Sequence, residues 1–183
     1  MHGIQSWVAL PDAQEETEPV FAHHPEADQP VQQEGGAWLR VLAGEAFGQR
    51  AAVKTLSPLF YVHVALAAGA RVALPREYPE RGAYLVSGAV SAEGQAVAAG
   101  HMMVFGPGAP AVVEARTPSV LMLLGGEPVG ERYIEWNFVS SSKGRIEQAK
   151  ADWRAGRMKL PDSDAAEFIP LPEGTHPSAG AMS

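Results

Sequence analysis

Short apolar runs alternate with glycine- and proline-containing turns along most of this chain. Alternating apolar and polar residues predict half-buried strands, and turns at intervals of roughly 8–12 residues are typical of antiparallel sandwiches and barrels. Turns this frequent leave no room for the crossover helices that parallel strands need. The predicted strands are Ile4–Leu10, Trp38–Ala43, Leu59–Leu66, Ala70–Leu74, Ala83–Val90, Gln95–Ala98, Met102–Phe105, Ala111–Ala115 and Val120–Leu124.

The pattern changes to a helical period after residue 139. The side chains of Ser140, Ser141 and Ser142 can cap the first amides of a helix over Lys143–Ala155, and Gly156 can end it in a left-handed conformation. We predict an amphipathic surface helix that packs an apolar stripe on the barrel. The apolar stripe is Ile146, Ala149 and Trp153, and the basic face is Lys143, Arg145, Lys150 and Arg154.

This pattern divides the chain into four parts. Residues 1–36 hold the first strand and an acidic arm, and residues 37–139 form the barrel. Residues 140–157 form the helix, and residues 158–183 form an extended tail whose end is expected to be disordered. The tail contains the apolar run Phe168–Pro172, which we expect to dock on the protein because apolar side chains avoid water.

Composition and charge limit the classes of function. The chain has 183 residues, 46% of them hydrophobic, which suffices for one domain with a core and an arm. The net charge is −7, and residues 1–39 contain seven acidic side chains and no Lys or Arg, which argues against nucleic-acid or anionic-membrane binding through this end. The absence of cysteine excludes disulfides, thiolate metal sites and a cysteine nucleophile. No apolar run reaches about 18 residues and the start lacks signal-peptide features, so we expect a cytoplasmic protein.

The spacing of residues 69 to 88 resembles the first motif of the cupin barrels, Gly-x5-His-x-His-x3-Glu-x6-Gly, whose His and Glu side chains hold a metal ion. Gly69 and Gly88 stand at its two ends, but Pro75, Glu77 and Arg81 occupy the ligand positions. A divalent first-row metal needs imidazole, thiolate or carboxylate donors that converge on one point. The stretch therefore predicts an all-β cupin barrel without its usual metal. An alternative use of the site is an ion pair between Glu77 and Arg81.

The remaining histidines do not replace the lost ligands. In the second cupin motif the ligand position falls on Met103, and His101 falls in the preceding turn. His63 shares a strand face with Tyr61, where it is either a hydrogen-bonded strand residue or an acid or base in a pocket. His23 and His24 lie in the acidic arm, where they can capture nickel or zinc weakly, and His176 is expected to be solvated.

Other catalytic arrangements are not supported either. Capping explains the serines of residues 140–142 without a nucleophile, which would need a base within hydrogen-bond reach. Gly106, Pro107 and Gly108 form a turn and not a phosphate cradle, because no helix with a Lys-Ser/Thr pair follows. We expect four side chains to fill the barrel interior or to line a ligand cavity there. They are Tyr61, Tyr84, Met103 and Phe105. No catalytic, cofactor-binding or metal-binding residue is predicted in this chain.

Several separate segments resemble the pirin family, and together they cover the chain from His2 to Pro172. His2–Pro11 resembles the segment that joins the two halves of a pirin, with departures at Ser6 and Ala9. The stretches over residues 41–45 and 124–128 resemble recurring pirin segments. Residues 138–142, 145–153 and 168–172 resemble the C-terminal signature of the family.

This resemblance implies a bicupin, in which the N-terminal barrel holds iron through three His and one Glu and the C-terminal barrel holds no metal. It also implies a link to quercetin 2,3-dioxygenase activity and, in animals, to redox-dependent transcriptional co-regulation. The chain would be the C-terminal half, so iron would belong to a half that is missing here. We favour a noncatalytic half that supports a metal-binding barrel and presents an interaction surface. The alternative is a quercetin 2,3-dioxygenase-type oxygenase that acts together with a metal-binding N-terminal half.

An isolated half is expected to associate, because two barrels in one chain bury apolar faces against each other. We expect either self-association, as a dimer that exchanges its first strand or its tail, or binding of a separate N-terminal cupin half. The residues expected to contribute are Trp7, Phe168, Ile169 and Leu171.

Overall fold

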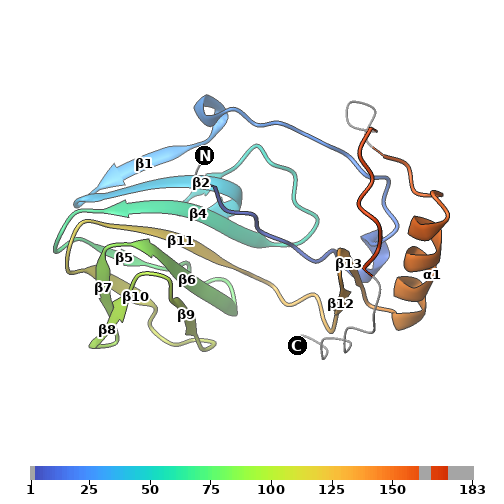
Figure 1. Ribbon diagram of the computed structural model, residues 1–183. Coiled ribbons are helices and arrows are strands. Elements are labelled where there is room, and N and C mark those ends of the chain that lie inside the picture. Colours follow the sequence, from blue (N-terminus) through green and yellow to red (C-terminus); the bar gives the residue numbers. More distant parts are fainter. Residues whose placement is uncertain (1–2, 161–165, 173–183) are drawn as a thin grey trace. The chain divides into compact units, whose positions relative to one another are not determined.

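The computed structural model describes residues 3–160 and 166–172 (Figure 1). Contacts within the chain divide it into two units, which we treat separately. The sandwich unit is Glu18–Pro128, and the terminal unit combines both ends of the chain, Met1–Thr17 and Val129–Ser183. The division therefore differs from the one expected from the sequence, since part of the acidic arm belongs to the sandwich unit and residues 129–139 do not.

The sandwich unit consists of two antiparallel sheets (Figure 1). The larger has the order β1-β2-β4-β11-β6-β9, with β3 paired to β2, and the smaller has the order β5-β10-β7-β8. The larger sheet contains β1 (Val31–Glu34), β2 (Ala37–Ala46), β3 (Gln49–Arg50), β4 (Leu59–Leu66), β6 (Glu80–Ser87), β9 (Met102–Phe105) and β11 (Ser119–Gly126). The smaller contains β5 (Arg71–Ala73), β7 (Ala89–Ala92), β8 (Gln95–Ala98) and β10 (Val112–Ala115). The predicted all-β cupin-type fold is confirmed as a sandwich, and no ladder between described strands closes it into a barrel.

Strict alternation of side chains places the core between the two sheets. On β4, Phe60, Val62 and Val64 are at most 1% exposed, whereas the residues between them are half-buried. The expectation that Tyr61 and Tyr84 face the interior is therefore wrong, because both alternate with core residues and lie on the other face. Phe105 is buried as expected, and Met103 packs against the core.

Gly88 separates two strands where the sequence pattern predicted one strand over Ala83–Val90. The chain leaves the larger sheet at the end of β6 and enters the smaller sheet as β7. Gly88 has a φ of 91°, a conformation that L-residues rarely adopt. The continuous apolar run concealed this change of sheet, since both strands have a buried face.

The terminal unit contains a hairpin and the helix. The hairpin strands β12 (Tyr133–Glu135) and β13 (Phe138–Ser140) were not predicted, and helix α1 (Lys143–Arg154) confirms the predicted helix to within one residue. Two 3₁₀ turns, Asp12–Gln14 in this unit and Glu26–Asp28 in the sandwich unit, lie in the N-terminal segment. The predicted strand Ile4–Leu10 is wrong, because this segment has no strand partner among the described residues, and a strand exists only as part of a ladder.

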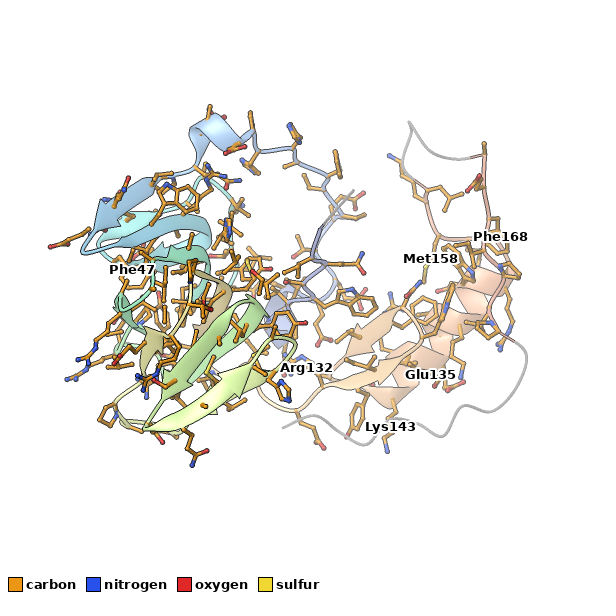
Figure 2. The ribbon with its side chains drawn as sticks, turned by 60° about the vertical axis from the view of Figure 1, so that its left-hand side comes forward. Phe47, Arg132, Glu135, Lys143, Met158 and Phe168 are labelled. Atoms are coloured by element: carbon orange, nitrogen blue, oxygen red, sulfur yellow. The ribbon has the colours of Figure 1, made fainter. Side chains whose placement is uncertain are left out.

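Helix α1 lies on the hairpin and holds the tail. Ile146 and Ala149 are buried, and α1 contacts β12 and β13. The indole of Trp153 stacks on Phe168 with ring centroids 4.9 Å apart, and its Nε1 donates a hydrogen bond to the Ile169 carbonyl at 2.9 Å. Figure 2 shows Phe168 beside the helix. The apolar tail therefore contacts Trp153, but it does not leave water as expected, since Phe168 and Ile169 remain 51% and 67% exposed. The end of the tail, with His176, lies outside the described residues.

Candidate functional site

Arg81 lies where the cupin motif places a metal-binding carboxylate. It is on the core-facing side of β6 and only 3% exposed, and its Nη2 donates hydrogen bonds of 2.8 Å to the carbonyls of Gly106 and Ala109. These carbonyls belong to the loop between β9 and β10. The guanidinium therefore fastens this loop to β6. A permanent cation at this position also repels a metal ion.

Glu77 does not pair with Arg81, so the alternative ion pair is wrong. Glu77 is exposed in the loop between β5 and β6, while its neighbour Tyr78 is buried against Phe60, with ring centroids 5.1 Å apart. The Tyr78 hydroxyl donates a 3.0 Å hydrogen bond to the Glu45 carbonyl. Burial and then the charge of Glu77 raise the pKa of Tyr78, which keeps this donor protonated. The loop buries the aromatic residue and leaves the carboxylate in water.

The side chains at the former ligand positions do not fit a metal ion. Pro75 has no donor, Met103 offers only a thioether, and Arg81 is a cation. Among residues 3–160 and 166–172, no three His, Cys, Asp or Glu side chains are grouped so that they can hold a metal. The usual metal of the cupin motif therefore has no ligand set in the described part of this chain.

The untagged chain is expected to contain far less than one iron, nickel, copper or zinc ion per molecule after dialysis. The reason is the donor set, since neither a guanidinium nor a proline can ligate these metals. Elemental analysis by mass spectrometry measures this. Stoichiometric metal that is lost on His63→Ala or Glu77→Ala, and retained when His23 and His24 are both replaced by alanine, would contradict the expectation.

Four of the six histidines are dispersed over the sandwich unit. His101 is exposed, and its Nδ1 lies 3.0 Å from the Ala98 carbonyl in the turn before β9, as the sequence predicted. His23 and His24 lie in the arm. His63 is half-buried on β4, on the same face as Tyr61 as predicted, and its ring meets Trp38 edge to face at 5.3 Å.

The region around His63 is electrostatically unfavourable for an imidazolium. The Arg40 guanidinium lies 4.7 Å from the Trp38 ring centroid and pairs with Glu26. Burial, followed by the charge of Arg40, lowers the pKa of His63. His63 is therefore neutral at pH 7.

An ion-pair cluster around a buried arginine in the terminal unit was missed by sequence reasoning, and its Asp12 side chain is 73% exposed. Arg132, labelled in Figure 2, has a side chain that is 5% exposed. Its Nη2 donates to the Leu10 carbonyl at 2.8 Å and to Asp12 at 2.5 Å, and its Nε lies 2.9 Å from Glu15 Oε1. We call Asp12, Glu15 and Arg132 the anchor cluster. Its one sequence signal is charge segregation, because an acidic segment without Lys or Arg can form ion pairs only with basic residues elsewhere in the chain.

Glu15 also accepts hydrogen bonds from two of the three serines that the sequence assigned to helix capping. The Ser141 amide donates to Glu15 Oε1 at 2.8 Å, and the hydroxyls of Ser140 and Ser141 donate to Oε2 at 3.0 and 3.1 Å. Only Ser142 caps α1, where its Oγ accepts from the Arg145 amide at 3.4 Å. The assignment of all three serines to capping is therefore wrong for Ser140 and Ser141.

A hollow of about 320 Å³ lies beside the anchor cluster, within the terminal unit. Trp7, Leu10 and Val139 give it apolar walls, and Asn137 and Glu15 give it polar groups. Both oxygens of Glu15 are already occupied by Ser140, Ser141 and Arg132, so Glu15 is not free to act as a base. The hollow offers apolar contact and no catalytic group of this kind.

Comparison with known proteins identifies the family. The model of the pirin C-terminal cupin domain matches residues 61–159. A pirin-like protein of Caulobacter vibrioides is 58% identical over 174 residues, which are 94% of this chain and 60% of that protein. The pirin of Homo sapiens is 31% identical over 84% of this chain and 56% of its own length.

Solved structures agree with the sequence matches. A crystal structure titled as quercetin 2,3-dioxygenase from Acinetobacter baumannii superposes with a TM-score of 0.81 and 25% identity, covering 96% of this chain and 59% of that one. The chain thus spans somewhat more than half the length of the relatives it matches. Among the described residues, no helix is both long and apolar enough to cross a membrane. The matched domain covers more than half of the sequence, and the chain belongs to the pirin family.

Proposed function

We propose that this chain is a noncatalytic cupin half that packs against and supports a metal-binding cupin barrel outside it. The observation that carries the proposal is Arg81, a buried cation that is fastened to the Gly106 and Ala109 carbonyls at the position of a metal ligand. The interior around it is a packed core of aliphatic and aromatic side chains. A domain of this kind contributes surface and rigidity to an assembly.

The relatives support a role within a larger assembly. The match to the Caulobacter protein leaves two fifths of that protein unmatched, and the human pirin leaves a similar share. Domains in one chain usually bury a shared interface of about 600–1,500 Å². The partner that we propose is a separately supplied barrel. The competing arrangement is self-association, in which a second copy of this chain takes the place of that barrel.

A second function is quercetin 2,3-dioxygenase-type oxygenation by this chain together with a metal-binding half. The similarity to a structure with that title favours it. Oxygen chemistry would then depend on the metal of the other half, because the donors described here do not converge. In that arrangement this chain would shape or close the pocket of its partner.

The chain alone is expected to cause no loss of the quercetin absorbance band above a protein-free control, at any iron supplement. Spectrophotometry in oxygenated buffer measures this. Adding the unmatched part of the Caulobacter protein tests the second function, which requires turnover that scales with this chain. Turnover by this chain alone that disappears on His63→Ala or Glu77→Ala would overturn the noncatalytic proposal, whereas turnover insensitive to both would mark a contaminant.

A further inference from the structure

The acidic arm contains a segment, residues 18–25, that belongs to no helix or strand. It begins directly after Thr17, where the first part of the terminal unit ends, and it leads to the 3₁₀ turn Glu26–Asp28. The backbone of residues 18–24 makes no hydrogen bond to another described residue. Its amides and carbonyls are therefore left to water, and local opening of such a segment costs little free energy.

Two apolar side chains of this segment are almost fully exposed. Val20 is 86% exposed and Phe21 is 91% exposed, the two highest values among the large hydrophobic residues that the structure describes. Phenylalanine is one of the residue types most often buried. An accessible aromatic side chain on an accessible backbone is what an enzyme that cuts peptide bonds needs in a substrate.

The residues around Phe21 select one kind of endoprotease. Partners that bind an extended peptide as a strand use its main-chain hydrogen-bonding groups, and the side chain before the cleaved bond enters the S1 pocket of the protease. A phenyl ring fits an apolar S1 pocket of the chymotrypsin type. Residues 1–39 contain no Lys or Arg, so a protease with an acidic, trypsin-like S1 pocket has no site here. The next residue, Ala22, is small and keeps its amide hydrogen.

We propose that the Phe21–Ala22 bond is a processing site for an endoprotease of chymotrypsin-like specificity. The co-reactant is water, which hydrolyses the amide bond between the Phe21 carbonyl carbon and the Ala22 nitrogen. The products are a carboxylate on Phe21 and a protonated amine on Ala22, since these are the charged forms of such termini at pH 7. The site is independent of the proposed function, which rests on Arg81 and the core.

Other exposed aromatic residues are poorer substrates. Trp7 is 52% exposed and Phe168 is 51% exposed, so about half of each side chain is covered by the protein. Phe168 also stacks on Trp153, with ring centroids 4.9 Å apart. An S1 pocket takes up the whole side chain, so these contacts have to break before the protease can cut. Phe21 needs no such rearrangement.

The cut leaves residues 1–21 attached to the rest of the protein without a covalent bond. It falls beyond Thr17, so every contact of the first part of the terminal unit is kept. The anchor cluster remains whole, and Arg145 still donates from Nε and Nη2 to the two carboxylate oxygens of Glu16. The fragment then acts as an acidic peptide ligand of the terminal unit. Because the contact is no longer intramolecular, the fragment loses its high effective concentration and becomes exchangeable.

Limited digestion of the full chain with chymotrypsin, at a low ratio of protease to protein, tests the site when the products are identified by intact mass. The first cut is expected after Phe21. Phe21→Ala should slow this cut at least about tenfold, because the S1 pocket loses its occupant. Phe168→Ala is the matched control, since it removes another exposed phenylalanine and should leave the cut after Phe21 at the parent rate.

Three results would overturn the processing site. They are a first cut elsewhere in the chain, equal rates for the parent and Phe21→Ala, and resistance of the parent to chymotrypsin. The last result would show that residues 18–25 are protected in solution.

Gel filtration of the cut chain tests whether the fragment is retained. Residues 1–21 should co-elute with residues 22–183 at pH 7 and separate from them in urea. A fluorescent synthetic peptide of residues 1–21 should exchange into the cut chain and not into the uncut one. Glu15→Ala should release the fragment, whereas Glu16→Ala should retain it, because the Glu16 side chain is 67% exposed and its ion pair contributes little. Release of the parent fragment on cutting would show that the terminal unit does not hold an acidic peptide.

Discussion

Replacing Glu15 by alanine will destabilise the terminal unit by about 3–5 kcal/mol, the range for removing one partner of a buried ion pair. The Glu15 side chain is 14% exposed and that of Arg132 is 5% exposed, so the substitution leaves a guanidinium in the interior with only Asp12 as a counter-charge. It also removes the acceptor of the Ser141 amide. An unpaired buried donor adds its own desolvation penalty.

Urea unfolding monitored by tryptophan fluorescence and near-UV circular dichroism measures this effect, because Trp7, Trp136 and Trp153 all belong to the terminal unit. Glu16→Ala is the control. Glu16 is the next residue and also pairs with an arginine, Arg145, but its side chain is 67% exposed, and exposed ion pairs contribute little to stability. Equal shifts for the two variants would mean that burial of the anchor cluster has no energetic consequence.

Gly88→Ala will prevent the sandwich unit from folding or destabilise it by more than about 3 kcal/mol. A Cβ at this position would lie 2.3 Å from Ser119 Oγ and 2.5 Å from the Pro118 carbonyl oxygen, and the φ of 91° is unfavourable for any L-residue. The neighbouring backbone cannot yield easily, because Ser119 begins β11, a central strand of the larger sheet.

Gly69→Ala is the matched control for this prediction. Gly69 stands at the other end of the same motif with a φ of 80°, but a Cβ there meets nothing within 4 Å. Gly69→Ala should therefore lower the free energy of unfolding only by the cost of a positive φ in an L-residue, about 1–2 kcal/mol. Denaturant midpoints of the purified variants measure both effects. A Gly88→Ala protein with the midpoint of Gly69→Ala would show that the clash is relieved without cost.

The local sequence pattern predicted the bounds of several strands correctly, but it did not predict which face of a strand is buried. The bounds of β4, β8 and β9 follow directly from alternation and flanking turns. Which of two apolar faces lies inside was not readable, because Tyr61 and Phe60 are both apolar enough for a core, and the tyrosines were assigned to the wrong side. The two-residue turn of the β12–β13 hairpin escaped prediction because it places Trp136, a bulky residue, at a φ of 52°.

At the candidate site, the sequence likewise shows which residues are present but not which groups they contact. The loss of the ligand residues at positions 75, 77 and 81 is visible in the sequence, because it concerns residue identity alone. The actual partners of Arg81 are backbone carbonyls, which every residue has, so no sequence pattern distinguishes Gly106 and Ala109. The anchor cluster joins residues more than a hundred positions apart, and charge segregation indicates that such pairs exist without identifying them.

The terminal unit is assembled from the two ends of the chain, and this determines the order in which the protein folds. Glu15 contacts Ser140 and Ser141 across 125 and 126 positions of sequence, so this contact closes one of the longest loops in the molecule. Loop closure over such a distance is entropically unfavourable unless the intervening chain is already compact. During synthesis the N-terminal segment leaves the ribosome long before Arg132 does, and domains that are complete fold first. The sandwich unit therefore forms while Glu15 is still unpaired, and the terminal unit closes last, when helix α1 has been synthesised.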